Sequence, residues 1–215
     1  MQHTLHSMAI FDMSVDGYTD WLSGQDLSNA FADLRDLLKV IQWQNGSVGR
    51  PWMLKNVFHI HDLATLRTTF PDAKVVWVHR HPRENLPSWC SLVHTLRRPL
   101  SAAEDARQTG RQQLAYWARA TERGIRQRVG LGENGFVDLH YGELLGNSRR
   151  TLDRVLTFFG EESSALTLDR LLEWEADNPQ HKHGRHVYSA EQYGLADGEI
   201  DTAFGQYIAH FGLSA

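Results

Sequence analysis

The residues with the clearest chemical potential follow a short apolar segment, Lys74 to His79. Arg80 comes directly after that segment, and Ser88 falls in the first turns of the helix expected next. A guanidinium and a hydroxyl beside a helix N-terminus could bind an anion, because the free backbone N–H groups of the helix add to their donors. The alternative is that Arg80 forms a surface salt bridge and that Ser88 has no role beyond its helix.

A second pair, Lys55 and His59, lies at the end of the preceding apolar segment, Trp52 to Val57. A lysine on a buried strand is costly unless an anion meets it. A histidine whose pKa lies near neutrality could serve as a general base. The alternative, which the pair taken alone favours, is a lysine that reaches solvent from an edge strand and a histidine that bonds to a backbone carbonyl.

A basic segment, Gln180 to His186, lies near the C-terminus and contains Lys182, Gly184 and Arg185. A segment of this composition could fold over a polyanion. A solvated loop is the more common explanation of such a charge run.

The sequence has 12 histidines, and several form pairs separated by one residue: His59 and His61, His79 and His81, His181 and His183. Residues i and i+2 share one face of an extended segment, so such a pair could chelate a metal. A metallo-β-lactamase-type motif would continue with an aspartate and a histidine, where this sequence has Leu63 and Ala64. Since no third ligand has an obvious spacing, no metal is expected, and a small histidine-based metallohydrolase remains an alternative.

The elements that must position these residues follow from periodicity. The pattern predicts strands at 52–57, 74–79 and 136–140, helices at 29–43, 63–70, 83–97, 102–129 and 149–159, an extended loop at 178–195, and a last helix through Ile200, Phe204 and Ile208. The segment 74–79 scarcely alternates, which predicts a strand buried on both faces. This order indicates an α/β fold with a parallel sheet, whose ligands lie beyond the carboxyl ends of the strands.

Composition narrows the class of protein. The chain of 215 residues is 41% hydrophobic and 22% charged, as expected of one globular domain. Its formal net charge of −4 lacks the basic excess of a nucleic-acid binder. With a single cysteine, no secretory leader and no apolar run near the roughly 20 residues that span a bilayer, we expect a cytoplasmic protein that contacts no membrane.

Five segments, in this order, resemble one known pattern: WMLKNVFH (52–59), FPDAKVVWVHRHP (70–82), SWCSL (88–92), FVDLHYGEL (136–144) and GRHVYSAEQYGL (184–195). They are similar to the bacterial sulfotransferases, which use 3′-phosphoadenosine-5′-phosphosulfate (PAPS). The family text reads "LKSPxH", "FPDAxxVxxHRDP" and "SxxSL", and the similarity runs from about Tyr18 to Tyr207.

The resemblance implies a three-layer P-loop-like α/β fold and a role for particular residues. Arg80 and Ser88 match the pair that binds the 3′-phosphate of PAPS or of its product adenosine 3′,5′-bisphosphate (PAP). Lys182, Gly184 and Arg185 match the loop, at 178–195, that covers the nucleotide. His59 matches the catalytic base and Lys55 a residue that stabilises developing charge. Such a mechanism requires no metal and takes a small-molecule acceptor.

The sequence also departs from the family pattern. The "LKSP" text has become Leu54-Lys55-Asn56-Val57, and the aspartate of "HRDP" is His81. The family begins with a strand and a loop of the type "GxPRTGTT" that holds the 5′-phosphosulfate, and no such segment occurs here. Residues 1–215 are therefore expected to form a single domain equivalent to the C-terminal portion of an N-terminally truncated family fold.

That truncation leaves more than one function open. The first expectation is a sulfotransferase that moves a sulfuryl group to a hydroxyl or amine and is impaired by the missing loop. The alternative is a non-catalytic remnant that binds a nucleotide or a partner. The exposed sheet edge would then accept a second copy of the chain or a complementing chain.

Overall fold

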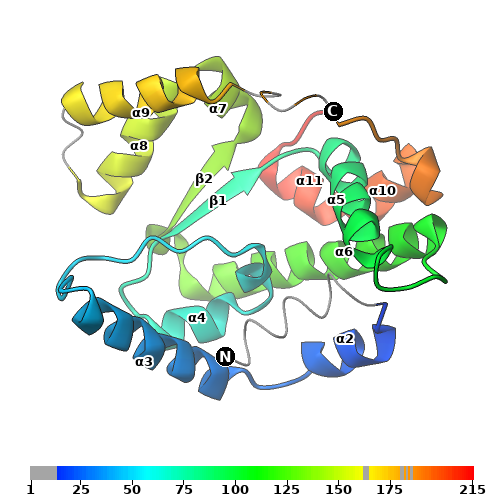
Figure 1. The fold of residues 1–215 in the computed structure, drawn as a ribbon, viewed down its shortest axis with the longest axis horizontal. Helices are drawn as coiled ribbons and strands as arrows, with labels where there is room; N and C mark the ends of the chain where they lie inside the picture. Colours follow the sequence, from blue (N-terminus) through cyan, green and yellow to red (C-terminus); the bar gives the residue numbers. More distant parts are fainter. Residues whose placement is uncertain (1–13, 162–164, 180–181, 183, 185) are drawn as a thin grey trace.

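Two short parallel strands, β1 (Val75–His79) and β2 (Phe136–His140), lie at the centre of the fold (Figure 1). The computed structural model describes residues 14–161, 165–179, 182, 184 and 186–215. The register pairs Val75 with Phe136 and His79 with His140, so both strands end in a histidine at the same edge. The fold is α/β, as predicted.

Helices surround this sheet. After α2 (Asp16–Ser23), α3 (Ser28–Gln44) packs on α4 (Leu63–Thr69), and α5 (Pro82–Arg97) packs on the long α6 (Ala106–Leu131). In Figure 1, α7 (Tyr141–Gly146), α8 (Ser148–Phe159) and α9 (Ala165–Asp177) form an arm on one side of the sheet, and α10 (Asp197–Ala203) and α11 (Gly205–Phe211) lie on the other side, near α5. Short 3-10 turns are η1 (Val57–His61), η2 (Glu133–Gly135) and η3 (Glu191–Tyr193).

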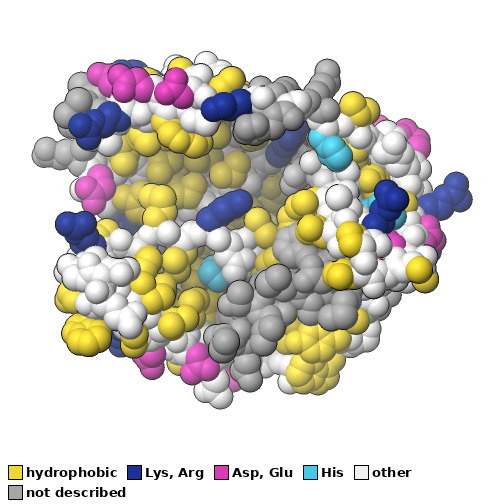
Figure 2. Space-filling view, in the orientation of Figure 1, with side chains coloured by type: hydrophobic (Ala, Val, Ile, Leu, Met, Phe, Trp, Pro, Cys, Tyr) yellow, Lys and Arg dark blue, Asp and Glu magenta, His cyan; other side chains and the backbone are white. Residues whose placement is uncertain are grey.

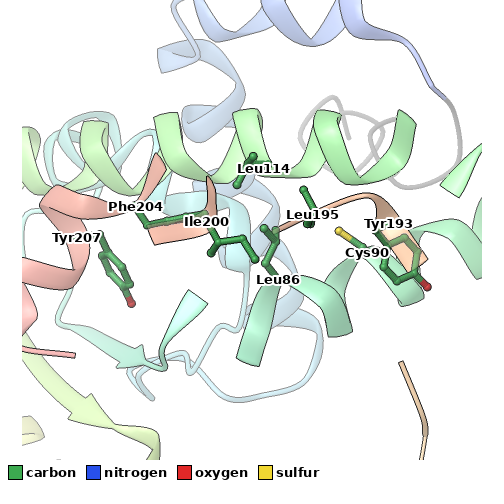
Figure 3. Close-up of a cluster of buried hydrophobic side chains, with 8 residues drawn as sticks. All are labelled: Leu86, Cys90, Leu114, Tyr193, Leu195, Ile200, Phe204 and Tyr207. Carbon is green, nitrogen blue, oxygen red and sulfur yellow. The ribbon is translucent and has the colours of Figure 1, made fainter. Parts of the chain in front are cut away.

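The largest core joins the C-terminal helices to α5 and α6. Figure 3 shows its eight buried side chains, which are Leu86, Cys90, Leu114, Tyr193, Leu195, Ile200, Phe204 and Tyr207. The backbone of α6 closely approaches that of η3 at Gly110, where a Cβ would lie 2.1 Å from the carbonyl oxygen of Tyr193. This core therefore fixes the C-terminal residues against the helix that follows β1.

Most of the predicted elements are confirmed, with their ends shifted. The helix predicted at 102–129 begins at Ala106, because the side chain of Asp105 accepts the Arg107 N–H at 2.9 Å and caps the helix. The single last helix is divided at Phe204 into α10 and α11. The sequence patterns did not predict α2, α7 or α9.

The strand predicted at 52–57 is wrong. Pro51 to Asn56 is extended and exposed, and no described strand lies beside it. The side chain of Asn56 accepts the Phe58 N–H at 2.9 Å, which turns the chain into η1 instead. Apolar residues there mimic a strand, but a strand needs a neighbour that supplies its hydrogen bonds.

The prediction that β1 is buried on both faces is also wrong, since Val78 is 49% exposed. Figure 2 shows the same face of the molecule as Figure 1, with a hollow beside the arm formed by α7, α8 and α9. Hydrophobic side chains line this hollow. Across the described ranges, no helix is both long enough and apolar enough to cross a membrane.

Candidate functional site

Arg80 follows β1 at the carboxyl edge of the sheet, where the sequence placed it. Its side chain is half-buried, and its Nε donates to Glu84 Oε2 at 2.8 Å. The guanidinium also lies over the ring of Tyr141, 4.8 Å from the ring centre. A solvent-accessible ion pair of this kind stabilises a fold by only about 0–1 kcal/mol. A phosphate could therefore take the place of Glu84, although the salt bridge expected as the alternative is present.

Ser88 lies in the second turn of α5, on the helix that Arg80 leads into. Two neighbours set where this helix begins: His81 Nδ1 accepts the Arg83 N–H at 3.2 Å, and Pro82 occupies the first helical position. Proline fits there because the first N–H groups of a helix have no partner within it. The histidine that stands where the family text has aspartate thus caps α5 in this chain.

Lys55 and His59 are separated by the turn into η1. Lys55 is exposed in the extended segment, whereas the half-buried ring of His59 lies 5.6 Å from that of Phe31. The buried ring of Phe58 packs 6.3 Å from Trp89, so η1 contacts α5 through residues adjacent to His59 and Ser88. The structure therefore brings the neighbours of the two predicted pairs together.

The members of the two described histidine pairs, His59 with His61 and His79 with His81, have different neighbours. The ring of His61 lies 4.5 Å from that of Tyr116, whereas His59 lies against Phe31. His79 is buried in the sheet and His81 caps α5. Among the residues that the structure describes, no group of three or more His, Cys, Asp or Glu side chains could hold a metal. His181 and His183 lie outside those residues.

The predicted nucleotide-covering segment is connected to α5 and to α9. The hydroxyl of Ser91 lies 2.6 Å from Nε2 of His186, which joins the segment to α5 just beyond Ser88. The ammonium of Lys182 donates to the Asp177 carbonyl at 2.7 Å and to Asn178 at 3.2 Å, at the end of α9. Gly184 has a φ of +102°. Arg185 lies outside the described residues.

The sequence analysis did not predict a buried polar network around His79, the residue directly before Arg80. The 1%-exposed His79 places Nδ1 2.9 Å from the Tyr207 hydroxyl and Nε2 2.8 Å from Asp138 Oδ1. Arg128 donates to both oxygens of Asp138, at 2.6 and 2.7 Å. The signal in the sequence was Asp138 itself, because a carboxylate within a buried strand must have a partner.

The charges of this network follow from its burial. Burial lowers the pKa of His79 and outweighs the hydrogen bond to Asp138 that raises it. Burial also opposes ionisation of Asp138, but the hydrogen bonds from His79 and Arg128 hold its pKa well below the usual range. Burial raises the pKa of Tyr207. At neutral pH the histidine is therefore neutral, the aspartate is ionised with Arg128 as its counter-ion, and the tyrosine keeps its proton.

Cys90 is the remaining nucleophile near the site. Its thiol is fully buried in α5, and burial raises its pKa to about 12. A thiol in this state is unreactive at neutral pH. The groups at the carboxyl end of β1 that could bind an anion are therefore Arg80 and the backbone of α5.

Comparison with known proteins identifies the family of the chain. A model of the sulfotransferase family matches residues 1–165. The omega-hydroxy-beta-dihydromenaquinone-9 sulfotransferases Stf3 of Mycobacterium bovis and Mycobacterium tuberculosis are 26% identical to the chain over 166 residues, which is 74% of this chain and 40% of theirs.

Two crystal structures are also similar. The sulfotransferase STF9 from Mycobacterium avium superposes with a TM-score of 0.84 and 26% identity, over 97% of this chain and 53% of that one. The sulfotransferase STF1 from Mycobacterium tuberculosis H37Rv superposes with a TM-score of 0.77 and 27% identity, over 90% of this chain and 49% of that one. The chain spans about half the length of these proteins.

Proposed function

Because the chain belongs to the sulfotransferase family, we propose that it acts in the transfer of a sulfuryl group from PAPS to a hydroxyl or amine of a small-molecule acceptor. The observation that carries this proposal is the position of Arg80, half-buried at the carboxyl end of β1 and directly before α5. In an open α/β sheet this edge is where ligands bind. The P-loop-like fold shared with the two crystal structures supports the same assignment.

The 3′-phosphate of PAPS would be held by Arg80 and Ser88. The residues present suit a phosphate, since the only carboxylate that Arg80 contacts in the described structure is the exposed Glu84, at 2.8 Å. Exchange of this carboxylate for a phosphate keeps the guanidinium paired, and Arg–phosphate hydrogen bonds are among the stronger ones in proteins. The ring of Tyr141 beneath Arg80 limits the positions that the guanidinium can adopt.

The segment 178–195 would cover the bound nucleotide and contribute Lys182, Gly184 and Arg185. The hydrogen bond between Ser91 and His186 supports this role, because it holds the segment against α5 close to Ser88. Lys182 would have to leave the end of α9 to reach a phosphate. Its bonds there are exposed, so little free energy opposes that movement.

The chemistry would be divided between His59 and Lys55. PAPS supplies an activated sulfuryl group when it is bound. His59 would accept the proton of the acceptor hydroxyl, and its half-buried position in η1 limits the orientations of the ring. Lys55 would stabilise the negative charge that develops during transfer. This division requires no metal.

A different function, binding without catalysis, also has an observation in its favour. The family's "GxPRTGTT" loop does not occur in the 215 residues. Three apolar side chains are exposed: Val78 of β1 (49%), and Met53 (82%) and Leu54 (48%) in the segment before η1. A partner chain or a second copy of this chain could bind to these exposed apolar residues without any catalysis.

We propose the cytoplasm as the location, where the lone Cys90 would remain reduced.

The first test is calorimetric titration of the purified chain with PAP, with ATP and Zn²⁺ as controls. We expect PAP to bind and the controls to bind weakly or not at all. Incubation with PAPS and an acceptor then separates the two functions, because PAP binding without turnover indicates the non-catalytic protein. Absence of PAP binding would contradict the proposed function. Sedimentation of the same sample would detect a homo-oligomer.

His59→Ala tests the assignment of the base. We expect this variant to bind PAP as tightly as the wild type and to lose the turnover that the wild type shows, by a factor of about 10²–10⁴, the usual contribution of a general base. His210→Ala is the matched control, since His210 is an exposed histidine of α11. A fully active His59→Ala variant would refute the role of this residue.

A further inference from the structure

The buried network of His79, Tyr207, Asp138 and Arg128 contains the residue that directly precedes Arg80, on which the proposed function depends. Tyr207 of α11 contributes its hydroxyl to this network. The same hydroxyl lies 2.9 Å from Nδ1 of His79. Figure 3 shows Tyr207 with its hydroxyl directed away from the other labelled core side chains, toward the strands. One phenol of α11 therefore holds the ring of the last residue of β1, directly before Arg80.

The donors and acceptors of this network fit in only one arrangement. The ionised Asp138 can only accept, so Nε2 of His79 carries the proton and donates to it, and Asp138 accepts two further bonds from Arg128. Nδ1 of the neutral ring is then the acceptor for the proton of the Tyr207 hydroxyl. Arg128 also donates to Glu133 at 3.0 Å. Each polar atom thus has a partner of the correct type while His79 is neutral.

We infer that Tyr207 and His79 are positioning residues, which hold the backbone of Arg80 so that its guanidinium is aimed at the 3′-phosphate. This inference rests on the proposed function. It accounts for a histidine and a tyrosine in a place where core packing alone would be served by phenylalanine. Phe211 stacks on the His79 ring at 3.8 Å and fixes its plane, so the imidazole has little freedom to choose other partners.

Protonation of His79 would break the arrangement. Nδ1 would become a donor facing the Tyr207 hydroxyl, which could then no longer donate its own proton to the ring. The titratable groups around His79 are Asp138 and His140 on β2, Arg128 on α6 and Tyr207 on α11. Arg128 already balances Asp138, so a second cation at His79 gains little from the carboxylate. Acid should therefore loosen the hold on Arg80.

The test compares PAP with AMP, which lacks the 3′-phosphate. We expect Tyr207→Phe to lower the affinity for PAP about tenfold, the effect of one lost buried hydrogen bond, and to leave the affinity for AMP unchanged. Tyr116→Phe is the matched control, because Tyr116 is an equally buried tyrosine (both 7% exposed) outside the site. Equal affinity of Tyr207→Phe and wild type for PAP would overturn the inference, as would an equal loss for PAP and AMP.

A second variant covers the outcome in which Tyr207→Phe fails to fold. His79→Gln can still donate to Asp138 and accept from Tyr207, but it cannot take up a proton. At pH 8 we expect this variant to bind PAP as tightly as the wild type. At pH 5.5 we expect it to lose less PAP affinity than the wild type does. Titration of the phosphate itself weakens binding equally in both proteins, and this shared pH dependence is subtracted. Identical pH profiles would overturn the inference. If the wild type does not prefer PAP over AMP, the proposed function itself is wrong, and the inference fails with it. If the wild type prefers PAP but the variants bind PAP like the wild type, only the inference is wrong.

Discussion

The guanidinium of Arg80 has a carboxylate partner before any nucleotide binds. Glu84 lies one helical turn along and accepts from Nε at 2.8 Å, while Tyr141 supports the other face of the guanidinium. A nucleotide phosphate bound at Arg80, as we propose, would compete with this carboxylate. Substitutions of Arg80 and of Glu84 should therefore change the nucleotide affinity in opposite directions, as expected of a phosphate site.

We predict that Arg80→Ala lowers the affinity for PAP by a factor of about 10–100, the range for one or two charged hydrogen bonds. Glu84→Gln should raise the affinity a few-fold, because it removes both the competing acceptor and its repulsion of the phosphate. Calorimetric titration measures both changes.

Arg98→Ala serves as the control for this pair, because Arg98 is an exposed arginine just beyond the end of the same helix. It should bind PAP like the wild type. If Arg80→Ala retains wild-type affinity, Arg80 is only the surface salt bridge that the sequence left open.

At the scale of elements, α6 connects the elements that carry the candidate site residues. It contacts α5, η1, α4 and η3, and it carries Arg128 of the buried network. Its glycines allow two of these approaches: a Cβ on Gly110 would meet the backbone of Tyr193, and one on Gly124 would meet Ile60 and Trp77. These glycines lower the helix propensity of α6 but permit contacts that larger residues would prevent.

Two substitutions in α6 should therefore have opposite effects. Gly110→Ala places a Cβ 2.1 Å from a backbone oxygen, and we expect it to destabilise the fold by about 1–3 kcal/mol or more. Gly130→Ala, where nothing lies within 4 Å, should be neutral or stabilising by up to about 1 kcal/mol through helix propensity. Chemical denaturation of both variants measures the free energy of unfolding. A Gly110→Ala variant as stable as the wild type would show that α6 and η3 are not packed in this way.

At the scale of the whole molecule, the buried network predicts how stability depends on pH. In the unfolded chain, His79 takes up a proton near its ordinary pKa of about 6.5, whereas burial lowers its pKa in the folded protein. The unfolded state therefore binds more protons once the pH falls below about 6.5, and the free energy of unfolding decreases. Asp138 acts in the same direction in more acid solution, because its folded pKa lies below its ordinary value of about 3.9.

We therefore expect the melting temperature to fall between pH 7 and pH 5, and His79→Gln to reduce that fall. Circular dichroism at several pH values checks this outcome. His210→Gln, at an exposed position of α11, should melt with the same pH dependence as the wild type. An unchanged slope in His79→Gln would mean that another group controls the acid transition.

The sequence determined the strands at 75–79 and 136–140, the helices between them and the place of Arg80, because local periodicity and the order of elements depend on neighbouring residues. It also led to the sulfotransferase family, which the family model matches over residues 1–165. The segment at 52–57 was misread for a physical reason: its apolar residues suit a strand, but only the fold decides whether another strand lies alongside.

The tertiary structure alone decided which polar groups meet. Tyr207 lies 128 positions from His79 in the chain, and Asp138 lies 59 positions from it, yet all three share hydrogen bonds. The contact of Arg80 with the ring of Tyr141, 61 positions along the chain, likewise depends on how α7 follows β2. No local pattern encodes such contacts, because they form only when α6, α11 and the two strands pack together and exclude water from the groups between them.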